Sequence, residues 1–447
     1  MKTLFDDASS IFWTIIFILV AAASGCQQNT PDSSPAKPNI VMILSDDHGF
    51  DDAGAYGNTA IHTPNIDRLA SEGLKFTRMY TTSAMCTPSR SALYTGLYPH
   101  RNGAYQNHSA VSPGIESMPH HLQKLGYRIA LLGKRHIKPL AQFPFEFLET
   151  DSLDSFISDP TPYVLLITPD EPHAPASMVF EASKRYNPQT IPLPPYLIDT
   201  PETRDQRTGY YDLVEILDNK VGHVINTLAA AEQFDTTLFI YTSDHGAGFP
   251  FEKWTCYEAG IKIPFVARWP GKIKMGTTTD AMASLIDVLP TFIEIAGGMS
   301  PDSLDGQSFL GVLQGQSDHH RDLIFSTHTT TGIIEGSYYP IRSVRDQRYK
   351  YIRNLNAEGL FTNLITNRTG QGGWNSWKVL AASNEQAMNR TEIYQKRPAE
   401  ELYDLHLDPY ELNNLAQEPE YQDIKTTLNQ SLQDWMYAVG DQEVENN

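Results

Sequence analysis

Short apolar runs rich in β-branched residues recur along much of the chain, and polar residues follow each run. The runs are Ile40–Leu44, Ile129–Leu132, Val164–Thr168, Leu238–Thr242 and the stretch IPFVAR, which begins at Ile263. Runs of this length are typical of buried strands. Helical spacing of apolar residues lies between them, in Asn65–Glu72, Ser89–Leu97, Met118–Leu125 and Thr208–Glu232. Alternation of strands and helices predicts an α/β fold, with a mostly parallel sheet covered by helices on both faces.

The pattern changes after about Gly315. Apolar and polar residues alternate from Ile341 to Ile352, which predicts one half-exposed strand. A final helix is expected near Ile424–Tyr437, whereas the polar stretch Thr362–Pro398 gives no clear pattern. We therefore expect an α/β domain at residues 39–315 and a smaller α+β subdomain with an antiparallel sheet at residues 316–447.

The first residues have the pattern of an export signal. Ile11–Ala23 is apolar but too short for a membrane-spanning helix, and the sequence AAASGC follows it and ends at Cys26. This stretch resembles a bacterial lipoprotein signal, in which the cysteine is lipidated and becomes the mature N-terminus. The alternative is an ordinary cleaved signal with an incidental cysteine.

The lipoprotein interpretation divides the N-terminal part of the chain in two. Residues 1–26 are the expected signal, and the polar residues 27–38 are an expected flexible tether. The mature protein would then be exported and held at a membrane by its lipid alone, in the periplasm or at the cell surface.

Composition narrows the classes of partner. The 447 residues include 53 acidic and 34 basic side chains, for a formal charge of −19. This excess argues against a general nucleic-acid binder, but a small basic pocket can still bind an anionic substrate. The chain has only three cysteines, so no disulfide framework is expected. Counting alone leaves a Cys86–Cys256 pair possible.

Ionisable residues directly follow four of the predicted strands. Ligands of parallel sheets bind outside the carboxyl ends of the strands, so these residues are expected to form one site. Asp46 and Asp47 follow the first strand, and Asp244 follows the fourth. Converging carboxylates repel one another unless they hold a cation, and oxygen ligands suit Ca²⁺ or Mg²⁺. An isolated Asp-Asp pair, by contrast, is more often a solvated turn or a helix cap.

Cys86 precedes a predicted helix start. Pro88 suits the first turn of a helix. A helix start offers free backbone N–H groups and the positive end of the helix dipole, and a cysteine there is a candidate reactive group. The alternative is a small buried apolar side chain.

The stretch CTPSRSALYTG, from Cys86 to Gly96, resembles the signature of type I sulfatases, Cys-x-Pro-x-Arg followed by Thr-Gly. The sequences SDDHG, GKRH, PHAP and SDHG occur in the order typical of that family, and the resemblance covers about Pro38–Ala416. It implies an alkaline-phosphatase-like α/β fold with a smaller C-terminal subdomain. It also implies that a formylglycine-generating enzyme oxidises Cys86 to Cα-formylglycine, whose hydrated aldehyde is the nucleophile.

The resemblance further implies a set of metal ligands for one calcium ion, with magnesium less expected. They are Asp46, Asp47, the modified Cys86, Asp244 and His245.

Other roles follow from the same resemblance. Arg90 would hold the formylglycine, and Lys134 and Lys253 would bind the sulfate oxygens. His136 would take a proton from the formylglycine hydrate after sulfate transfer, and His173 would be the general acid for the leaving group. Taken one at a time, such lysines are most often surface charges and such histidines structural.

Several stretches resemble the heparan N-sulfatase (sulfamidase) branch, among them GKRHIKPLAQFPFEF and ELYDLHLDPYELNNLA. Bacterial members of this branch act on varied sulfated polysaccharides, including algal ones such as ulvan. The predicted function is therefore hydrolysis of sulfate esters or sulfamates on a sulfated polysaccharide or its oligosaccharides. The alternatives are an N-sulfoglucosamine sulfohydrolase, a phosphonate or phosphodiester hydrolase of the same superfamily, and a non-catalytic carbohydrate-binding lipoprotein.

Residues that would contact the sugar are harder to predict. His100, Arg101 and His108, with Asn107, lie in a predicted loop after the nucleophile helix and are candidates. Arg342 and Arg345 could reach a uronate or a sulfate from the subdomain, but we expect both to face solvent.

Overall fold

The computed structural model describes residues 37–175, 180–367 and 372–441. The predicted signal, the lipidation site at Cys26 and nearly all of the tether lie outside the described residues. Within the described residues, nine strands form one mixed sheet with the order β4-β3-β5-β1-β6-β7-β2-β8, and β9 pairs with β2. The strands are β1 Asn39–Ser45, β2 Leu74–Tyr80, β3 Arg128–Gly133, β4 Glu146–Leu148, β5 Tyr163–Thr168, β6 Thr237–Ser243, β7 Lys262–Arg268, β8 Thr277–Thr279 and β9 Ala283–Ser284.

Strand β1 lies inside the sheet, parallel to β5 on one side and to β6 on the other. β3 continues the parallel order beyond β5. β7 runs antiparallel to both β6 and β2, so the run that begins at Ile263 is a strand as predicted, but with reversed direction. The prediction of a mostly parallel sheet between helices is confirmed.

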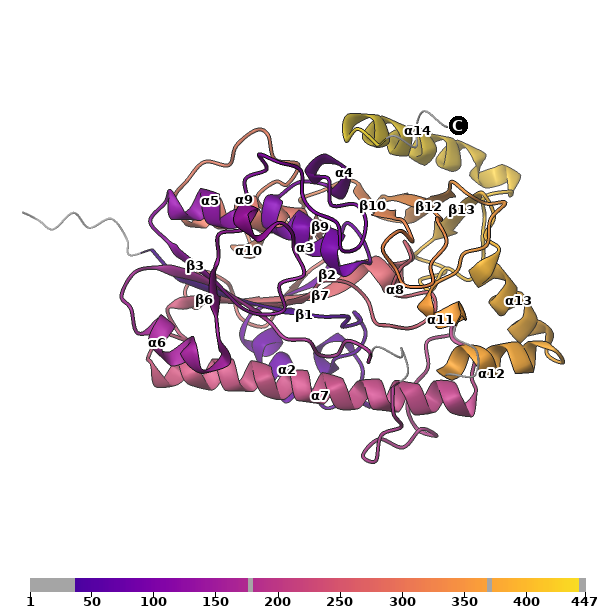
Figure 1. Cartoon of the computed structure of the whole chain (residues 1–447), viewed down its shortest axis with the longest axis horizontal. Helices are drawn as coiled ribbons and strands as arrows, with labels where there is room; N and C mark the ends of the chain where they lie inside the picture. The colour runs from indigo at the N-terminus through magenta and orange to yellow at the C-terminus, as the bar shows by residue number, and fades with distance from the viewer. Residues whose placement is uncertain (1–36, 176–179, 368–371, 442–447) are drawn as a thin grey trace, which may run out of the picture. The chain divides into compact units, whose positions relative to one another are not determined.

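Helices cover both faces of this sheet (Figure 1). Alternate residues of β1 point to opposite faces, and both sets are apolar. Ile40, Met42 and Leu44 pack in one cluster, whereas Val41 and Ile43 pack in another. The first cluster includes residues of α3 Cys86–Thr95, α5 Met118–Gln123, α9 Val288–Ile295 and α10 Leu310–Leu313. The second includes residues of α2 Pro64–Glu72, α6 Leu153–Ile157 and α7 Pro201–Ala230.

The C-terminal part contains a second sheet, antiparallel, with the order β10-β11-β12-β13. Its strands are β10 Ile324–His328, β11 Ile341–Arg345, β12 Tyr349–Asn354 and β13 Glu400–Asp404. The final helix, α14 Gln422–Ala438, packs its residues Leu428 and Leu432 against Val344 and Tyr351 of this sheet. The polar stretch that gave no pattern contains α11 Leu364–Asn367, α12 Gly372–Ala381 and α13 Glu385–Gln395. The domain ranges 39–315 and 316–447 stay a prediction.

The prediction of one half-exposed strand at Ile341–Ile352 is wrong. The segment is a hairpin of β11 and β12, and every residue of β11 is buried. The reason is that both faces of β11 are covered, with Val344 in the cluster of α14 and Ile341 in a cluster with aromatic residues of the C-terminal part.

The expectation that Arg342 and Arg345 face solvent is also wrong. Arg342 is buried and forms an ion pair with Asp441. Arg345 is buried and donates to Glu258 Oε2 at 2.8 Å. The polar positions of this alternating segment that carry Arg342 and Arg345 therefore hold buried ion pairs and do not form a solvated face.

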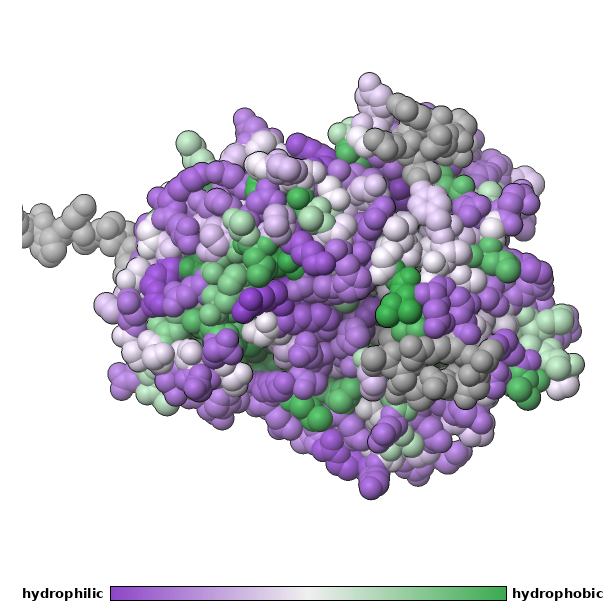
Figure 2. Space-filling view, viewed as in Figure 1, coloured by the Kyte–Doolittle hydropathy of each residue, from purple (hydrophilic) through white to green (hydrophobic). Residues whose placement is uncertain are grey.

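Hydrophilic residues predominate on the face of the molecule shown in Figure 2, and apolar residues lie there in separate patches. Across the described segments, no helix combines the length and apolar character needed to cross a membrane.

The long helix α7 stabilises the start of α2, which lies on the same face of the sheet. Thr63, which precedes α2, makes no side-chain cap hydrogen bond. The buried carboxylate of Asp218 in α7 accepts from the backbone N–H groups of Asn65, at 3.1 Å, and Ile66, at 2.9 Å. A carboxylate from a distant helix thus replaces the local cap.

Replacing this carboxylate should destabilise the fold. We expect Asp218→Ala to lower the free energy of unfolding by about 2 kcal/mol, because two helix N–H groups lose their acceptor. Urea unfolding measures the change. Asn219→Ala, at the next and exposed position of α7, is the control and should change it by less than about 0.5 kcal/mol. Equal effects of the two substitutions would contradict the capping role.

Candidate active site

The predicted site residues meet at the carboxyl ends of β1, β3, β5 and β6. β1 and β6 pair in register up to Ser45 and Ser243, so the residues after these two strands are neighbours. Asp244 N donates to Ser45 O at 3.1 Å. On the other side, Lys134 N donates to Thr168 O at 2.8 Å and brings the end of β3 to the end of β5.

Three carboxylates lie together at this edge. Asp46, Asp47 and Asp244 are completely buried, and one oxygen of each lies within 4.8 Å of the others. Asp47 N also donates to Asp244 Oδ1 at 3.1 Å. Buried carboxylates at this spacing repel one another unless positive charge is supplied. Their oxygens are the donor type that hard divalent cations prefer, so the cluster fits such an ion.

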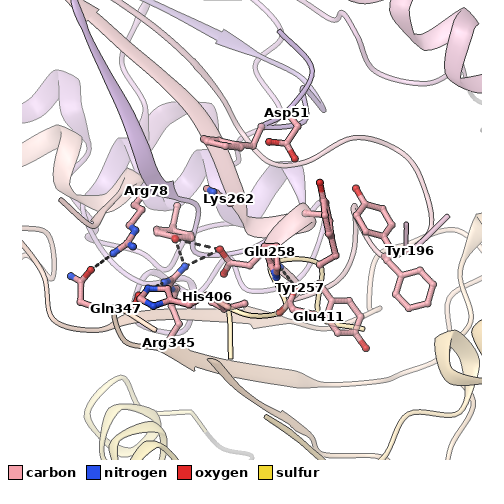
Figure 3. A pocket seen from close by; sticks show the side chains of 17 residues that line it. Asp51, Arg78, Tyr196, Tyr257, Glu258, Lys262, Arg345, Gln347, His406 and Glu411 are labelled. Carbon is pink, nitrogen blue, oxygen red and sulfur yellow. Dashed lines mark hydrogen bonds and ion pairs between the residues drawn. The ribbon is translucent and has the colours of Figure 1, made fainter. Parts of the chain in front are cut away.

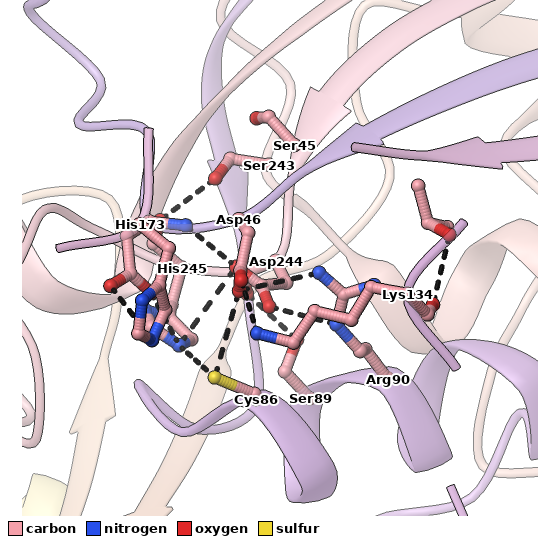
Figure 4. A network of polar contacts seen from close by, with 12 residues as sticks. Ser45, Asp46, Cys86, Ser89, Arg90, Lys134, His173, Ser243, Asp244 and His245 are labelled. Atoms are coloured by element: carbon pink, nitrogen blue, oxygen red, sulfur yellow. Dashed lines mark hydrogen bonds and ion pairs between the residues drawn. The ribbon is translucent and has the colours of Figure 1, made fainter. Parts of the chain in front are cut away.

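Three cationic side chains pair with the carboxylates, and Figure 4 shows two of them, Arg90 and Lys134. Arg90 Nε donates to Asp244 Oδ2 at 3.0 Å, and Lys134 Nζ pairs with Asp46. Lys253 Nζ donates to Asp47 Oδ1 at 2.8 Å and to Oδ2 at 2.5 Å.

These cations decide the charge state of the cluster. Burial alone raises the pKa of Asp46, but Arg90 and Lys134 outweigh it and hold this pKa well below its usual range. Asp46 is therefore ionised despite its complete burial.

Cys86 is the first residue of α3 and lies against the carboxylate cluster. Its Sγ is 3.6 Å from Asp46 Oδ1 and 3.9 Å from Lys253 Nζ. Burial raises the pKa of the Cys86 thiol, but the charges of Lys253 and Lys134 outweigh this effect and lower it. Both Cys86 and Cys256 are free, buried thiols, which excludes the disulfide that counting had left open.

Ser89 fixes the start of α3 and was not predicted as a site residue. Its Oγ donates to Asp244 O at 2.7 Å and accepts from Thr81 Oγ1 at 2.8 Å. Every residue of α3 is buried. The position of Cys86 is thus tied directly to the end of β6. No sequence signal separates Ser89 from an ordinary helical serine.

Two histidines border the carboxylates. His245 Nδ1 donates to Gly246 O at 3.0 Å, so Nε2 is the atom that lies 3.3 Å from Asp47 Oδ1 and 3.5 Å from Cys86 Sγ. His173 Nδ1 donates to Ala174 O at 2.5 Å, and its Nε2 lies 3.8 Å from Asp47 Oδ2. In both cases the local carbonyl orients Nε2 towards the cluster.

His136 and His108 form a pair beside the cluster. His136 Nε2 is 2.7 Å from His108 Nδ1. Burial, together with Lys134 and Arg90, lowers the pKa of His136 to about 4, so the imidazole is neutral at neutral pH. His108 N donates to Thr87 Oγ1 at 3.1 Å, which attaches the pair to the start of α3.

The remaining substrate candidates have other partners. His100 and Arg101 lie in the short helix α4 Pro99–Asn102 rather than in the predicted loop. His100 Nε2 faces Arg342 at 3.1 Å, and Arg101 Nη1 pairs with Asp305 at 2.5 Å. Asn107 Oδ1 accepts from Thr87 N at 3.3 Å. The structure thus brings His108 and Asn107 into contact with Thr87 of α3, whereas His100 and Arg101 pair with Arg342 and Asp305.

Comparison with known proteins identifies relatives along most of the chain. The family model described as Sulfatase matches residues 38–163 and 150–299, and the model for the C-terminal part of N-sulphoglucosamine sulphohydrolase matches residues 245–364. An ulvan-active sulfatase of Formosa agariphila is 35% identical, over 96% of this chain and 88% of the relative. Human N-sulphoglucosamine sulphohydrolase is 28% identical, over 91% of each chain.

Solved structures share the fold. One, described as a complex with its substrate D-glucosamine-2-N,6-O-disulfate, superposes with a TM-score of 0.70 at 20% identity and covers 91% of this chain and 99% of that chain. A phosphonate monoester hydrolase of Agrobacterium radiobacter superposes with a TM-score of 0.68 at 18% identity, covering 91% and 96%.

Arg90 should be essential to the stability of the cluster. We expect Arg90→Gln to lower the free energy of unfolding by about 3–5 kcal/mol, because it removes the buried partner of two carboxylates. The measurement is urea unfolding in the presence of a chelator, so that no metal ion substitutes for the guanidinium. Arg101→Gln, which breaks a partly exposed ion pair, is the control and should cost less than about 1 kcal/mol. Losses of similar size would contradict the assignment.

Proposed function

The chain belongs to the sulfatase family and is a sulfuric ester hydrolase, and we propose that it releases sulfate from a sulfated polysaccharide or its oligosaccharides through residue 86. The observation that carries the proposal is the position of Cys86, at the start of a buried helix, 3.6 Å from Asp46 Oδ1 and within 4.8 Å of a carboxylate oxygen of Asp47 and of Asp244. The Cys-x-Pro-x-Arg sequence and this position both support residue 86 as the proposed nucleophile.

Residue 86 is the proposed precursor of the nucleophile. Converted to Cα-formylglycine by a formylglycine-generating enzyme, it would supply a hydrated aldehyde, and one of its hydroxyls would attack sulfur as the bond from sulfur to the sugar oxygen breaks. The second hydroxyl would then lose its proton, so that the aldehyde re-forms and sulfate leaves. The surrounding groups suit an oxygen at this position. Lys253 lies 3.9 Å from Cys86 Sγ, and the positive end of the α3 dipole favours negative charge there.

The donor set supports a calcium site in the same place. Asp46, Asp47 and Asp244, with residue 86 and His245 Nε2, would hold the ion, and carboxylate oxygens suit Ca²⁺. When bound, the cation lowers the pKa of a hydroxyl and offsets charge on the sulfate. Three buried carboxylates face three cations, of which Arg90 and Lys253 are buried and Lys134 is partly exposed, so a dication would leave the site with the excess positive charge that an anionic sulfate needs.

Lys134 and Lys253 are the proposed ligands of the sulfate oxygens. Each holds a carboxylate of the cluster, so each ammonium group already lies beside the nucleophile. Negative charge that develops on the sulfuryl oxygens is stabilised by such fixed cations in a buried site.

Two histidines are proposed to move protons. His173 would act as the general acid, with Nε2 as the delivering atom because Ala174 O holds the hydrogen on Nδ1. His136 would accept a proton from the hydrate at Nδ1, an atom for which the described residues provide no partner. Its lowered pKa, about 4, keeps the imidazole neutral and able to accept.

The substrate class rests on the relatives. The relative at 35% identity is described as an ulvan-active sulfatase, whereas the sulphoglucosamine enzyme is 28% identical. We therefore propose an O-sulfated algal polysaccharide of the ulvan kind first and an N-sulfated glucosamine second. Resemblance to the phosphonate monoester hydrolase, at 18% identity, reflects the fold alone, and relative turnover of an aryl sulfate and an aryl phosphodiester separates these two chemistries.

Export and lipid anchoring complete the proposal. The sequence AAASGC, ending at Cys26, supports a lipoprotein signal, followed by a polar tether up to residue 38. Mass spectrometry of the protein made in a bacterial host tests the lipid on Cys26.

Removal of the Cys86 side chain should abolish catalysis. With a formylglycine-generating enzyme co-produced, we expect the wild type to release sulfate from O-sulfated rhamnose–uronate fragments and Cys86→Ala to release none above background. Circular dichroism should show the same fold for both, because only one small side chain is lost. Release by the wild type from N-sulfated glucosamine alone would move the substrate to the second class. Full activity of the variant would refute the nucleophile.

A divalent cation should stabilise the folded protein through the carboxylates. At about 100 times its dissociation constant, Ca²⁺ should raise the free energy of unfolding by about 2.7 kcal/mol. Asp244→Asn should lose most of this gain, whereas Asp302→Asn, at an exposed position, should keep it. Thermal unfolding with chelator or with Ca²⁺ measures the difference. The same gain in both variants would place the cation elsewhere.

A further inference from the structure

A cavity separate from the candidate active site lies where the first sheet meets the C-terminal sheet (Figure 3). It has a volume of about 270 Å³ and shares no residue with the carboxylate and cysteine cluster. Phe50 and Asp51 of the loop after β1, Lys262 at the start of β7 and residues 405, 406 and 409–411 after β13 line it. Its size is near the lower end of the range for ligand pockets, about 300–1,000 Å³, which suits a single sugar ring better than a large ligand.

Two charged side chains of this cavity, Lys262 and Asp51, lack a direct hydrogen bond or ion pair in the part of the chain that the structure describes. Lys262 Nζ lies 3.9 Å from the centroid of the Phe50 ring and makes no hydrogen bond or ion pair with any described residue. Asp51 likewise makes none within the described part of the chain, but it is exposed and lies close enough to Lys262 that each charge shifts the pKa of the other. Burial lowers the pKa of Lys262. A partly buried ammonium group without a direct ion pair is costly, so Lys262 is suited to an anionic ligand group, and the exposed Asp51 can accept hydrogen bonds from the same ligand.

One side of the cavity carries excess positive charge. Arg345 and Lys350 donate to Glu258, at 2.8 and 3.3 Å, and Lys262 lies near the same carboxylate. Burial raises the pKa of Glu258, but these three cations outweigh it and lower the pKa to about 2. Arg78 adds a further cation and binds Gln347. An anionic group would be stabilised on this side.

The other side is aromatic. Figure 3 shows Arg78 and Arg345 on one side of the cavity and Tyr196 away from them, whereas Asp51 lies near Lys262. The Tyr196 ring lies 6.3 Å from that of Phe251 and 6.2 Å from that of Tyr410. Aromatic faces present apolar area, and a nearby carboxylate accepts hydroxyl hydrogens. A sugar ring, with apolar C–H faces and hydroxyl edges, is complementary to such a wall.

We propose that this cavity is a second saccharide-binding site that takes a uronate residue. The carboxylate of the uronate lies beside Lys262, its hydroxyls bind Asp51, and its ring packs on the aromatic wall. A small inorganic anion would make no use of the aromatic wall or of Asp51 as an acceptor, and a neutral sugar would leave Lys262 without a direct ion pair. The inference rests on the proposed function, which makes a polysaccharide the source of the uronate.

Binding of a uronate residue at this cavity would strengthen the binding of long substrates, which can reach the cavity and the catalytic site together. A polymer held at the cavity is present at the catalytic site at a raised effective concentration, whereas a short aryl sulfate is not. The site therefore affects the KM for polysaccharide and leaves turnover of an aryl sulfate unchanged.

Binding of an unsulfated probe tests the site without any sulfatase reaction. Methyl glucuronide would be titrated into the full-length wild type by calorimetry, with methyl glucoside and acetate as the reference ligands. We expect the glucuronide to bind more tightly than either. Lys262→Met should weaken glucuronide binding at least about tenfold, to the level of the glucoside, and Asp51→Asn should weaken both sugars.

Control variants separate this inference from the proposed function. Cys86→Ala should bind the glucuronide as the wild type does, and so should Lys272→Ala, at an exposed lysine outside the cavity. Lys262→Met should raise the KM for the polysaccharide and leave aryl sulfate turnover intact. Unchanged glucuronide binding in both cavity variants would overturn the site, and so would acetate binding as tight as the glucuronide. Neither result bears on sulfate release, which the Cys86 experiment tests.

Discussion

A balance of buried charge at one edge of the sheet underlies the organisation of this protein. Asp46, Asp47 and Asp244 are completely buried, and Arg90, Lys134 and Lys253 neutralise them. Such a set is costly to bury and persists only when every group has a partner. Its members come from the loops after β1, β3 and β6 and from α3, so the charge balance requires the sheet order to be correct.

The apolar parts of the fold could be predicted because their pattern is local. The five predicted strands are β1, β3, β5, β6 and β7, and the long helix α7 was expected from its spacing. The sequence did not reveal β2, whose pairing with β7 is interrupted by an irregularity between Phe76 and Met79. Burial of β11 on both faces depends on α14 and on aromatic residues far away in the chain. Local alternation carries no information on such distant cover.

The candidate site could be predicted further than the fold around it, because short motifs placed its residues at strand ends. Pairing within the site could not be predicted. Nothing in the sequence connects Arg90 with Asp244 or His136 with His108, yet both pairs are in direct contact. Arg342 shows the same limit. The sequence pattern around it suggested a solvated side chain, but its partner, Asp441, lies 99 positions away in the chain. Buried ion pairs of high sequence separation are the features that single-sequence reasoning misses.

Complete burial of α3 has a consequence for the order of events in biosynthesis. Cys86 is 2% exposed, and the helix that it begins has no exposed residue. A modifying enzyme can act only on a side chain that it can reach, and the folded protein buries this one. The proposed conversion of Cys86 would therefore have to precede folding, on the nascent or still unfolded chain. A protein that folded with the thiol intact would stay unmodified. The yield of active molecules would then depend on the rate of modification relative to the rate at which α3 packs onto the sheet.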